Sequence, residues 1–272
     1  MIPCPRRLLP ILGLASTALW GSAPRALSAQ VAPAAHADTL QVSVGFGHTR
    51  FGGFQDPWTE GSVSVTGIAD PGALVARLNR ARRYGAEGTQ VEFDLYPKLG
   101  GERYGYLNLG WSGSSAFPHH RYGAELFTSL TGPWEASAGV RHLRFRTTHV
   151  TLYTGSLGVY RGNWWFSVRP FVTPDAGDAS VSATFSARRY GRDRFDYWGL
   201  AFGVGASAAE FTTAQDLVRR SSVTVGASGR RPLGDGRWNL AWGVSWEREE
   251  LPSDRVRRRL GADLGLTFTV SG

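Results

Sequence analysis

Apolar side chains alternate with small or polar ones along the chain from about Thr39 to Val270. The last segment is a clear example, since after position 262 its even positions are apolar and its odd positions are Gly, Asp or Thr. A period of two predicts β-strands with two chemically different faces. The pattern therefore indicates an all-β fold over most of the 272 residues.

About fourteen segments of this kind follow one another, with twelve as the lower alternative. Their approximate ranges are 39–48, 58–68, 73–83, 88–96, 103–112, 120–130, 133–145, 148–159, 163–173, 179–189, 196–206, 217–230, 237–248 and 255–270. Gly and Pro occupy the breaks, as in Asp70-Pro71-Gly72 and Gly234-Asp235-Gly236, where the backbone must reverse. The connections after odd-numbered segments are mostly longer, which predicts that they face the cell exterior. Tyr84–Glu87 and Gly191–Phe195 depart from this rule.

The two faces of the predicted strands differ in the same way from one segment to the next. Val91, Phe93 and Leu95 alternate with Gln90, Glu92 and Asp94. A soluble β-protein would pack the bulky face into a core, whereas a membrane barrel turns it toward lipid. The opposite face is rich in Gly, Ser and Ala, which suits a crowded barrel interior better than a soluble surface. We therefore predict a transmembrane antiparallel up-and-down β-barrel.

Aromatic residues gather near the predicted strand ends, as in the interfacial girdle of a membrane barrel. The residues assigned to this girdle are Tyr96, Trp111, Tyr122, Trp134, Tyr160, Trp164, Tyr190, Trp238 and Trp246. The charged residues assigned to the lumen are Glu92, Asp94, Glu125, Glu135, Arg141, Arg169, Arg188, Glu247 and Asp263. Because both signs are present, these charges either line a narrow pore and set its selectivity or pair across the lumen and plug it.

Residues 1–29 have the pattern of a cleaved signal peptide, and 30–38 form an Ala- and Pro-rich entry to a barrel domain over 39–272. Arg6 and Arg7 precede an apolar stretch, and small residues lead to a cleavage site near Ala29. Outside this leader the chain has no run of 18 apolar residues, which excludes a helical membrane protein. The single cysteine, Cys4, lies within the leader, so the mature chain has no thiol chemistry.

The formal net charge is +8, and loss of three leader arginines leaves about +5. The remaining arginines are scattered along strands and at strand ends, which argues against nucleic-acid binding. Arginines at the ends of membrane strands instead meet lipid phosphates, so we expect outer-membrane lipid and lipopolysaccharide as partners. The pentapeptide Ala81-Arg82-Arg83-Tyr84-Gly85 recurs as Ala187-Arg188-Arg189-Tyr190-Gly191. We interpret both copies as basic and aromatic borders of membrane strands, with a duplication remnant or a lipopolysaccharide contact as alternatives.

Several central motifs resemble the YaiO family of outer-membrane β-barrels. They are Phe117-Pro118, Arg121-Tyr122-Gly123-Ala124-Glu125-Leu126, Trp134-Glu135-Ala136-Ser137-Ala138-Gly139-Val140-Arg141, Tyr153-Thr154-Gly155-Ser156-Leu157-Gly158 and Trp165-Phe166-Ser167-Val168-Arg169-Pro170. The resemblance covers roughly residues 40–270 and implies an outer-membrane barrel. Some relatives carry a helical-repeat domain ahead of the barrel that suggests polysaccharide traffic. We expect no such domain in this chain, which argues against that link here. The terminal strand also resembles the signal read by the barrel-assembly machinery, with Phe268 in place of a terminal aromatic residue.

The inward charges favour a narrow pore or transport accessory for small polar or saccharide-like solutes, with no cofactor. One alternative is a barrel enzyme that modifies membrane lipid, for which His119, His120, His142 and His149 are the candidate residues. That alternative lacks a positioned nucleophile and orienting group, so we expect no enzyme. His119 and His120 are adjacent in one loop, but two histidines without a further ligand do not make a metal site. A non-conducting structural barrel is the remaining alternative.

Overall fold

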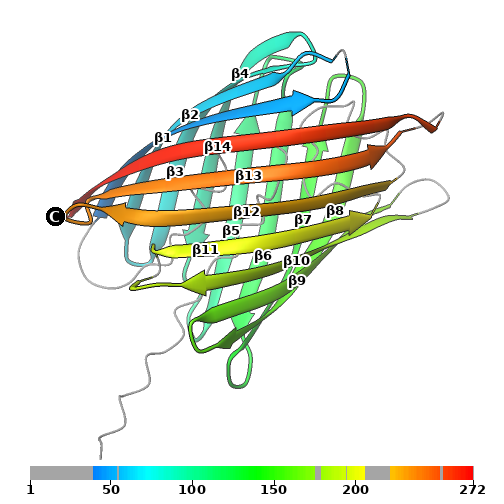
Figure 1. Ribbon diagram of the computed structural model, residues 1–272. Coiled ribbons are helices and arrows are strands. Elements are labelled where there is room, and N and C mark those ends of the chain that lie inside the picture. The colour runs from blue at the N-terminus through cyan, green and yellow to red at the C-terminus, as the bar shows by residue number, and fades with distance from the viewer. Residues whose placement is uncertain are drawn as a thin grey trace, which may run out of the picture.

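The chain forms a closed antiparallel β-barrel (Figure 1). The structure is a computed structural model that describes residues 39–53, 55–174, 179–193, 195–205, 221–251 and 254–271. The strands are β1 (Thr39–Phe51), β2 (Trp58–Ala69), β3 (Gly72–Arg83), β4 (Ala86–Pro97), β5 (Arg103–Trp111), β6 (His120–Ser129), β7 (Trp134–Arg144), β8 (His149–Arg161), β9 (Trp164–Pro174), β10 (Ala179–Tyr190), β11 (Tyr197–Gly205), β12 (Ser221–Leu233), β13 (Trp238–Glu250) and β14 (Val256–Ser271).

Every strand pairs antiparallel with its neighbours in the sequence, and β1 pairs with β14 to close the sheet. The predicted fold class and the count of fourteen strands are confirmed, and the alternative of twelve strands is wrong. No helix in the described ranges is long and apolar enough to cross a membrane. The predicted signal peptide and entry segment, residues 1–38, lie outside the described residues. Residues 217–220, predicted to begin the twelfth strand, also lie outside them.

The two ends of the barrel carry connections of different length. We call the end with Thr39 and the last residues of β14 the termini end, which lies at the left of Figure 1, and the opposite end the loop end. Two-residue links such as 162–163 occur at the termini end, whereas the loop end includes the longer connection 112–119. The short link predicted after the third strand is observed at 84–85. The predicted outer connection Gly113–His119 therefore lies at the loop end, whereas the other longer ones, 49–57, 174–178, 207–216 and 249–254, lie partly or wholly outside the described residues.

The outward face of the barrel is apolar and exposed, and its inward face is polar and buried. On β4, Phe93 is 46% exposed, whereas Glu92 and Asp94 on either side are 1% and 3% exposed. A water-soluble protein has the opposite arrangement, because water expels large apolar side chains into the core. The outward side chains of this barrel therefore require an apolar solvent around them.

Most of the predicted girdle residues lie on the outward face. The exposed ones are Trp111, Tyr122, Trp134, Trp238 and Trp246. Half-buried Trp164 stacks on the exposed Phe166, with ring centroids 5.7 Å apart. The outward Trp198 was not predicted, although its position at the start of β11 matches the others.

The girdle assignment is wrong for Tyr96, Tyr160 and Tyr190, which face inward. Tyr96 is 4% exposed and packs in an apolar cluster with Tyr104 and Phe127. Tyr96 shares its parity with Glu92 and Asp94, so the alternation along the strand decides its direction. Strand parity, and not nearness to a strand end, therefore sets the face that Tyr96 takes.

Candidate functional site: the polar interior of the barrel

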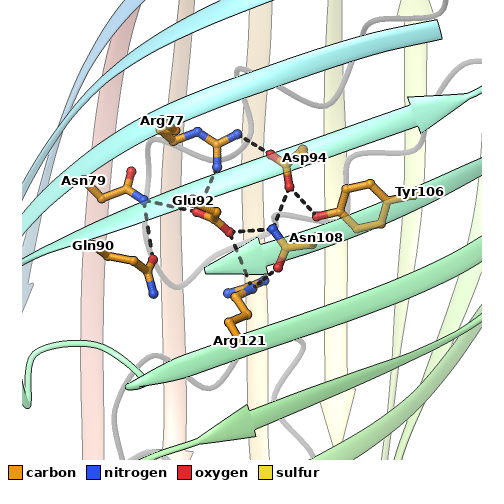
Figure 2. A network of polar contacts seen from close by, with 8 residues as sticks. All are labelled: Arg77, Asn79, Gln90, Glu92, Asp94, Tyr106, Asn108 and Arg121. Atoms are coloured by element: carbon orange, nitrogen blue, oxygen red, sulfur yellow. Dashed lines mark hydrogen bonds and ion pairs between the residues drawn. The ribbon is translucent and has the colours of Figure 1, made fainter. Parts of the chain in front are cut away.

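Strands β3 to β6 carry a dense polar network on their inward face, which we call the packed wall (Figure 2). Its members are Arg77, Asn79, Gln90, Glu92, Asp94, Tyr106, Asn108 and Arg121. All except the half-buried Tyr106 are at most 5% exposed. The strand register explains the network, because it places Arg77 directly beside Glu92 across the β3–β4 pair.

The packed wall is held by charge-assisted hydrogen bonds. Arg77 donates from Nη1 to Glu92 Oε2 at 3.0 Å and from Nη2 to Asp94 Oδ2 at 2.8 Å. Asn108 Nδ2 donates to both carboxylates, at 2.9 Å to Glu92 Oε1 and at 2.6 Å to Asp94 Oδ1. Arg121 Nε donates to Asn108 Oδ1 at 2.8 Å, so the amide bridges a cation and two anions. Loss of one charged partner from such a network costs about 3–5 kcal/mol, because the other is left buried without its counter-charge.

A second buried ion pair joins strands that are not adjacent. Arg169 on β9 donates from Nη1 to Glu125 Oε1 on β6 at 2.6 Å, and Ser137 Oγ donates to the same oxygen at 2.6 Å. Glu135 on β7 accepts a hydrogen bond from Trp165 Nε1 at 2.9 Å. Two of the predicted lumen residues, Glu125 and Arg169, therefore neutralise each other inside the barrel.

The loop end contains a cluster of buried charges and rings near β1 to β3 and β13 to β14. Arg83 donates from Nε to Glu60 Oε1 at 2.7 Å and from Nη1 to the carbonyl of Ala116 at 3.1 Å. Its guanidinium carbon lies 4.9 Å from the ring centre of Phe117, which is 2% exposed. The connection 112–119 is therefore anchored inside the loop end by Arg83.

The same cluster continues on the two last strands. Arg259 Nη2 contacts Glu247 Oε2 at 2.7 Å and Glu249 Oε1 at 2.6 Å, and Arg257 Nε contacts Glu249 Oε2 at 2.5 Å. A separate apolar cluster lies at the loop end on β7 to β9; its members are Leu143, Phe145, Val150, Leu152 and Phe171. Both clusters occupy interior space, so they narrow this end of the barrel.

Apart from the loop-end charges, Arg230 and Asn239, the inward face of β10 to β14 and β1 is built mostly from Ser, Thr, Ala and Gly. We call its half-buried part the open wall. Its half-buried members are Ser43, Gly45, Ser186, Arg188, Gly203, Thr224, Ser228, Ser245, Gly261 and Asp263. Asp263 lies between Gly47 of β1 and Gly243 of β13 in the strand register. Short side chains reach less far into the barrel, which leaves these residues accessible from inside.

The structure places all nine predicted lumen residues on the inward face, buried or half-buried. It brings together Glu92 with Asp94 and Glu125 with Arg169, and it leaves Arg141, Arg188 and Asp263 half-buried. That these residues line an open lumen stays a prediction. The sequence interpretation missed Glu60, Arg77, Arg83, Arg121, Glu249, Arg257 and Arg259. Strand parity could have found each of them, because each alternates with outward neighbours.

Of the candidate histidines of the enzyme alternative, His142 and His149 lie near the loop end on β7 and β8, and His119 has a buried Nε2. His142 Nδ1 and Thr151 Oγ1 are 2.9 Å apart, and the His142 and His149 rings are 5.7 Å apart. The His120 ring stacks on the Tyr122 ring, with ring centroids 6.2 Å apart. Within the described ranges no group of three or more His, Cys, Asp or Glu is arranged to hold a metal ion.

Comparisons with known proteins agree with a membrane barrel. A family profile described as the YaiO membrane beta barrel domain matches residues 39–210. No curated protein sequence matches significantly. Among solved structures, the TodX deltaS2S3 mutant, a monoaromatic hydrocarbon channel, is similar with a TM-score of 0.52 and 8% identity over 88% of this chain and 91% of that chain. The outer membrane protein Omp33 of Acinetobacter baumannii is similar with a TM-score of 0.50 and 10% identity over 85% of this chain and 98% of that chain. At these identities the likeness shows the fold alone.

Proposed function

Because the chain belongs to the YaiO membrane β-barrel family, we propose that it forms a narrow aqueous passage through an outer membrane. The family membership confirms the resemblance carried by the central sequence motifs. In this proposal the exposed apolar face contacts lipid, the loop end faces the cell exterior and the predicted signal peptide directs export. The solutes are small and polar or saccharide-like.

The observation that carries this proposal is the contrast in accessibility between the two inward walls. Ser228 and Ser245 lie near the middle of β12 and β13, face inward and are half-buried. Glu92 and Asn108, also inward, are 1% and 2% exposed. Since the sheet is closed, an inward residue that solvent reaches borders space inside the barrel. We propose that water follows the open wall past the packed wall.

The chemistry of the two walls supports a polar and small solute. Hydroxyl groups of Ser186, Ser228 and Ser245 offer donors and acceptors without bulk. The packed wall and the loop-end clusters occupy part of the cross-section. A barrel of this size lies between filled eight-stranded barrels and wide sixteen-stranded ones. These features favour a narrow, off-centre path over a wide channel.

Thiol modification tests the position of the passage. In a Cys4→Ser background, we expect Ser228→Cys to react with a charged, water-soluble thiol reagent and single-channel conductance in a planar bilayer to fall. The matched control is Ser64→Cys, because Ser64 also faces inward but is 6% exposed beside Arg77. Equal reactivity at both positions, or absence of any conductance from the folded unmodified protein, contradicts the proposal.

A second candidate function, modification of membrane lipid, is favoured by one contact only. The hydrogen bond between His142 and Thr151 pairs a base with a hydroxyl on the outward surface. Within the described residues, the contacts of His142 are with Thr151, Tyr122 and His149, and none of them is a carboxylate that would orient the imidazole. A changed lipid A mass on overexpression, lost in Thr151→Val, would favour this candidate over the passage.

We further propose two partners for the outward surface. Arg80 and Arg82 point outward at the loop end of β3, with side chains 76% and 59% exposed, where lipopolysaccharide phosphates would lie. The alternating terminal strand β14 (Val256–Ser271) is the segment that barrel-assembly machinery would recognise. Weaker retention of lipopolysaccharide by the Arg80→Gln, Arg82→Gln double variant is the expected result in a co-purification assay.

A further inference from the structure

Arg188 is an inward arginine near the termini end that makes no ion pair with a described residue. Its Nη1 is 3.5 Å from the Tyr190 hydroxyl, and its guanidinium carbon lies 4.3 Å from the ring centre of Tyr197 and 5.4 Å from that of Trp165. The side chain is half-buried on the open wall. A guanidinium has five N–H donors, and the one long hydrogen bond leaves most of them available.

Six other inward arginines are built differently. Arg77, Arg83, Arg121, Arg169, Arg257 and Arg259 each contact a carboxylate at 3.6 Å or less. Arg169 is also 1% exposed, so its charge is both neutralised and enclosed. Arg188 instead keeps its charge where solvent reaches it.

Aromatic rings hold Arg188 in place without supplying an anion. Trp165 and Tyr197 are 3% and 9% exposed, so they form a fixed support behind the guanidinium. Contacts between a guanidinium and a ring attract the cation to the ring and provide no acceptor oxygen. The Trp165 indole is itself fixed by its hydrogen bond to Glu135. The guanidinium is therefore preorganised, which lowers the entropy cost of binding an oxyanion.

The surroundings leave room and carry charges of both signs. Glu135, which accepts the hydrogen bond from Trp165, interacts electrostatically with Arg188. Gly199 is the register neighbour of Arg188 on β11 and has no side chain to cover it. Arg230 on β12 lies opposite Tyr197 in the register, with its guanidinium carbon 4.7 Å from the Phe195 ring centre. Arg230 therefore neighbours Tyr197 in the sheet, at the same end of the barrel as Arg188.

We propose that Arg188, supported by Trp165 and Tyr197, is a binding subsite for the oxyanion of an acidic sugar. The guanidinium fork takes two oxygens of a carboxylate or a phosphate in a bidentate pair. That the ligand is a sugar rests on the proposed function, in which the passage takes small polar or saccharide-like solutes. The subsite narrows that class of solutes to anionic ones. The oxyanion part rests on Arg188 and its surroundings alone.

Calorimetric titration of the refolded full-length protein in detergent tests the subsite without requiring conductance. The probes are glucuronate, glucose 6-phosphate and glucose, which share a hexose ring and differ in the anionic group. We expect one or both acids to bind and glucose not to bind. Glucuronate alone identifies a carboxylate and glucose 6-phosphate alone a phosphate. Binding of neither acid, or equal binding of glucose, overturns the proposal.

Matched variants assign the binding to Arg188. Arg188→Gln should weaken binding of the acid about 10-fold to 100-fold, the effect of losing a charged hydrogen-bonding partner. Arg189→Gln is the control, because Arg189 is the next residue but is exposed on the outward face. Arg188→Lys keeps the positive charge but loses the bidentate guanidinium geometry, so it should bind the acid with intermediate affinity. This variant keeps the test valid if Arg188→Gln does not fold. Unchanged affinity in both Arg188 variants contradicts the subsite even if the protein conducts ions.

Discussion

Glu92 on the packed wall and Asp263 on the open wall are both carboxylates that face the barrel interior, but their neighbours differ. In the strand register Glu92 lies between Arg77 and Gly110, whereas Asp263 lies between two glycines, Gly47 and Gly243. Glu92 is 1% exposed and bound by a cation, and Asp263 is half-buried. The same type of side chain therefore stabilises one wall and borders accessible space at the other.

The largest expected effect is a difference in the free energy of unfolding between a substitution on the packed wall and one on the open wall. Glu92→Ala should lower the free energy of unfolding by about 3–5 kcal/mol, because Arg77 loses one of its two buried counter-charges. Asp263→Ala should change it by less than about 0.5 kcal/mol, since no buried partner is left behind. Urea unfolding in lipid vesicles, followed by tryptophan fluorescence, measures both. Equal losses would remove the distinction between the walls.

A substitution next to Glu92 compares the inward face with the outward face. Phe93→Arg should cost about 2–4 kcal/mol in lipid vesicles if Phe93 lies near the bilayer midplane. Phe93→Leu, which keeps the side chain apolar, is the control and should cost less. The same unfolding assay applies, and a neutral Phe93→Arg variant would show that this face does not contact lipid.

A bulky residue on the open wall should affect conduction more than stability. Ser245→Trp places a large ring beside the proposed path, and we expect a roughly two-fold fall in single-channel conductance. The outward neighbour Trp246 provides the control through Trp246→Phe, which should leave conductance unchanged. A Ser245→Trp barrel that conducts like the parent protein would place the path elsewhere.

The smallest expected effect concerns an exposed ion pair at the termini end. Lys98 Nζ lies 2.8 Å from Asp70 Oδ1, but the side chains are 40% and 83% exposed. Lys98→Ala should change the free energy of unfolding by less than about 1 kcal/mol, because water screens exposed pairs. If urea unfolding gave as large a loss for Lys98→Ala as for Glu92→Ala, burial would not determine how much an ion pair contributes to the free energy of unfolding.

Strand parity in the sequence determined most of the fold and the direction of most side chains. The period of two located fourteen strands and the inward placement of Glu92, Arg169 and Asp263. The direction of a side chain was predicted wrongly where nearness to a strand end was used in place of parity, as for Tyr96. The partner of each charged residue could not be predicted in the same way, because Arg169 and Glu125 are 44 residues apart in sequence and lie on strands that are not adjacent. Which charges meet depends on strand register and barrel closure.

The repeated pentapeptide separates what sequence determines from what tertiary structure decides. In the first copy Arg83 faces inward at the loop end, bound to Glu60, and Arg82 faces outward. In the second copy Arg188, which matches Arg82, faces inward at the termini end, and Arg189 faces outward. Matching residues of the two copies thus lie on opposite faces of the sheet. The reason is that inward positions fall on odd residue numbers in β3 and on even residue numbers in β10. The sequence by itself determined the alternation, whereas the closed sheet decided which of its carboxylates and arginines are neutralised and which are accessible, because both depend on the neighbouring strands.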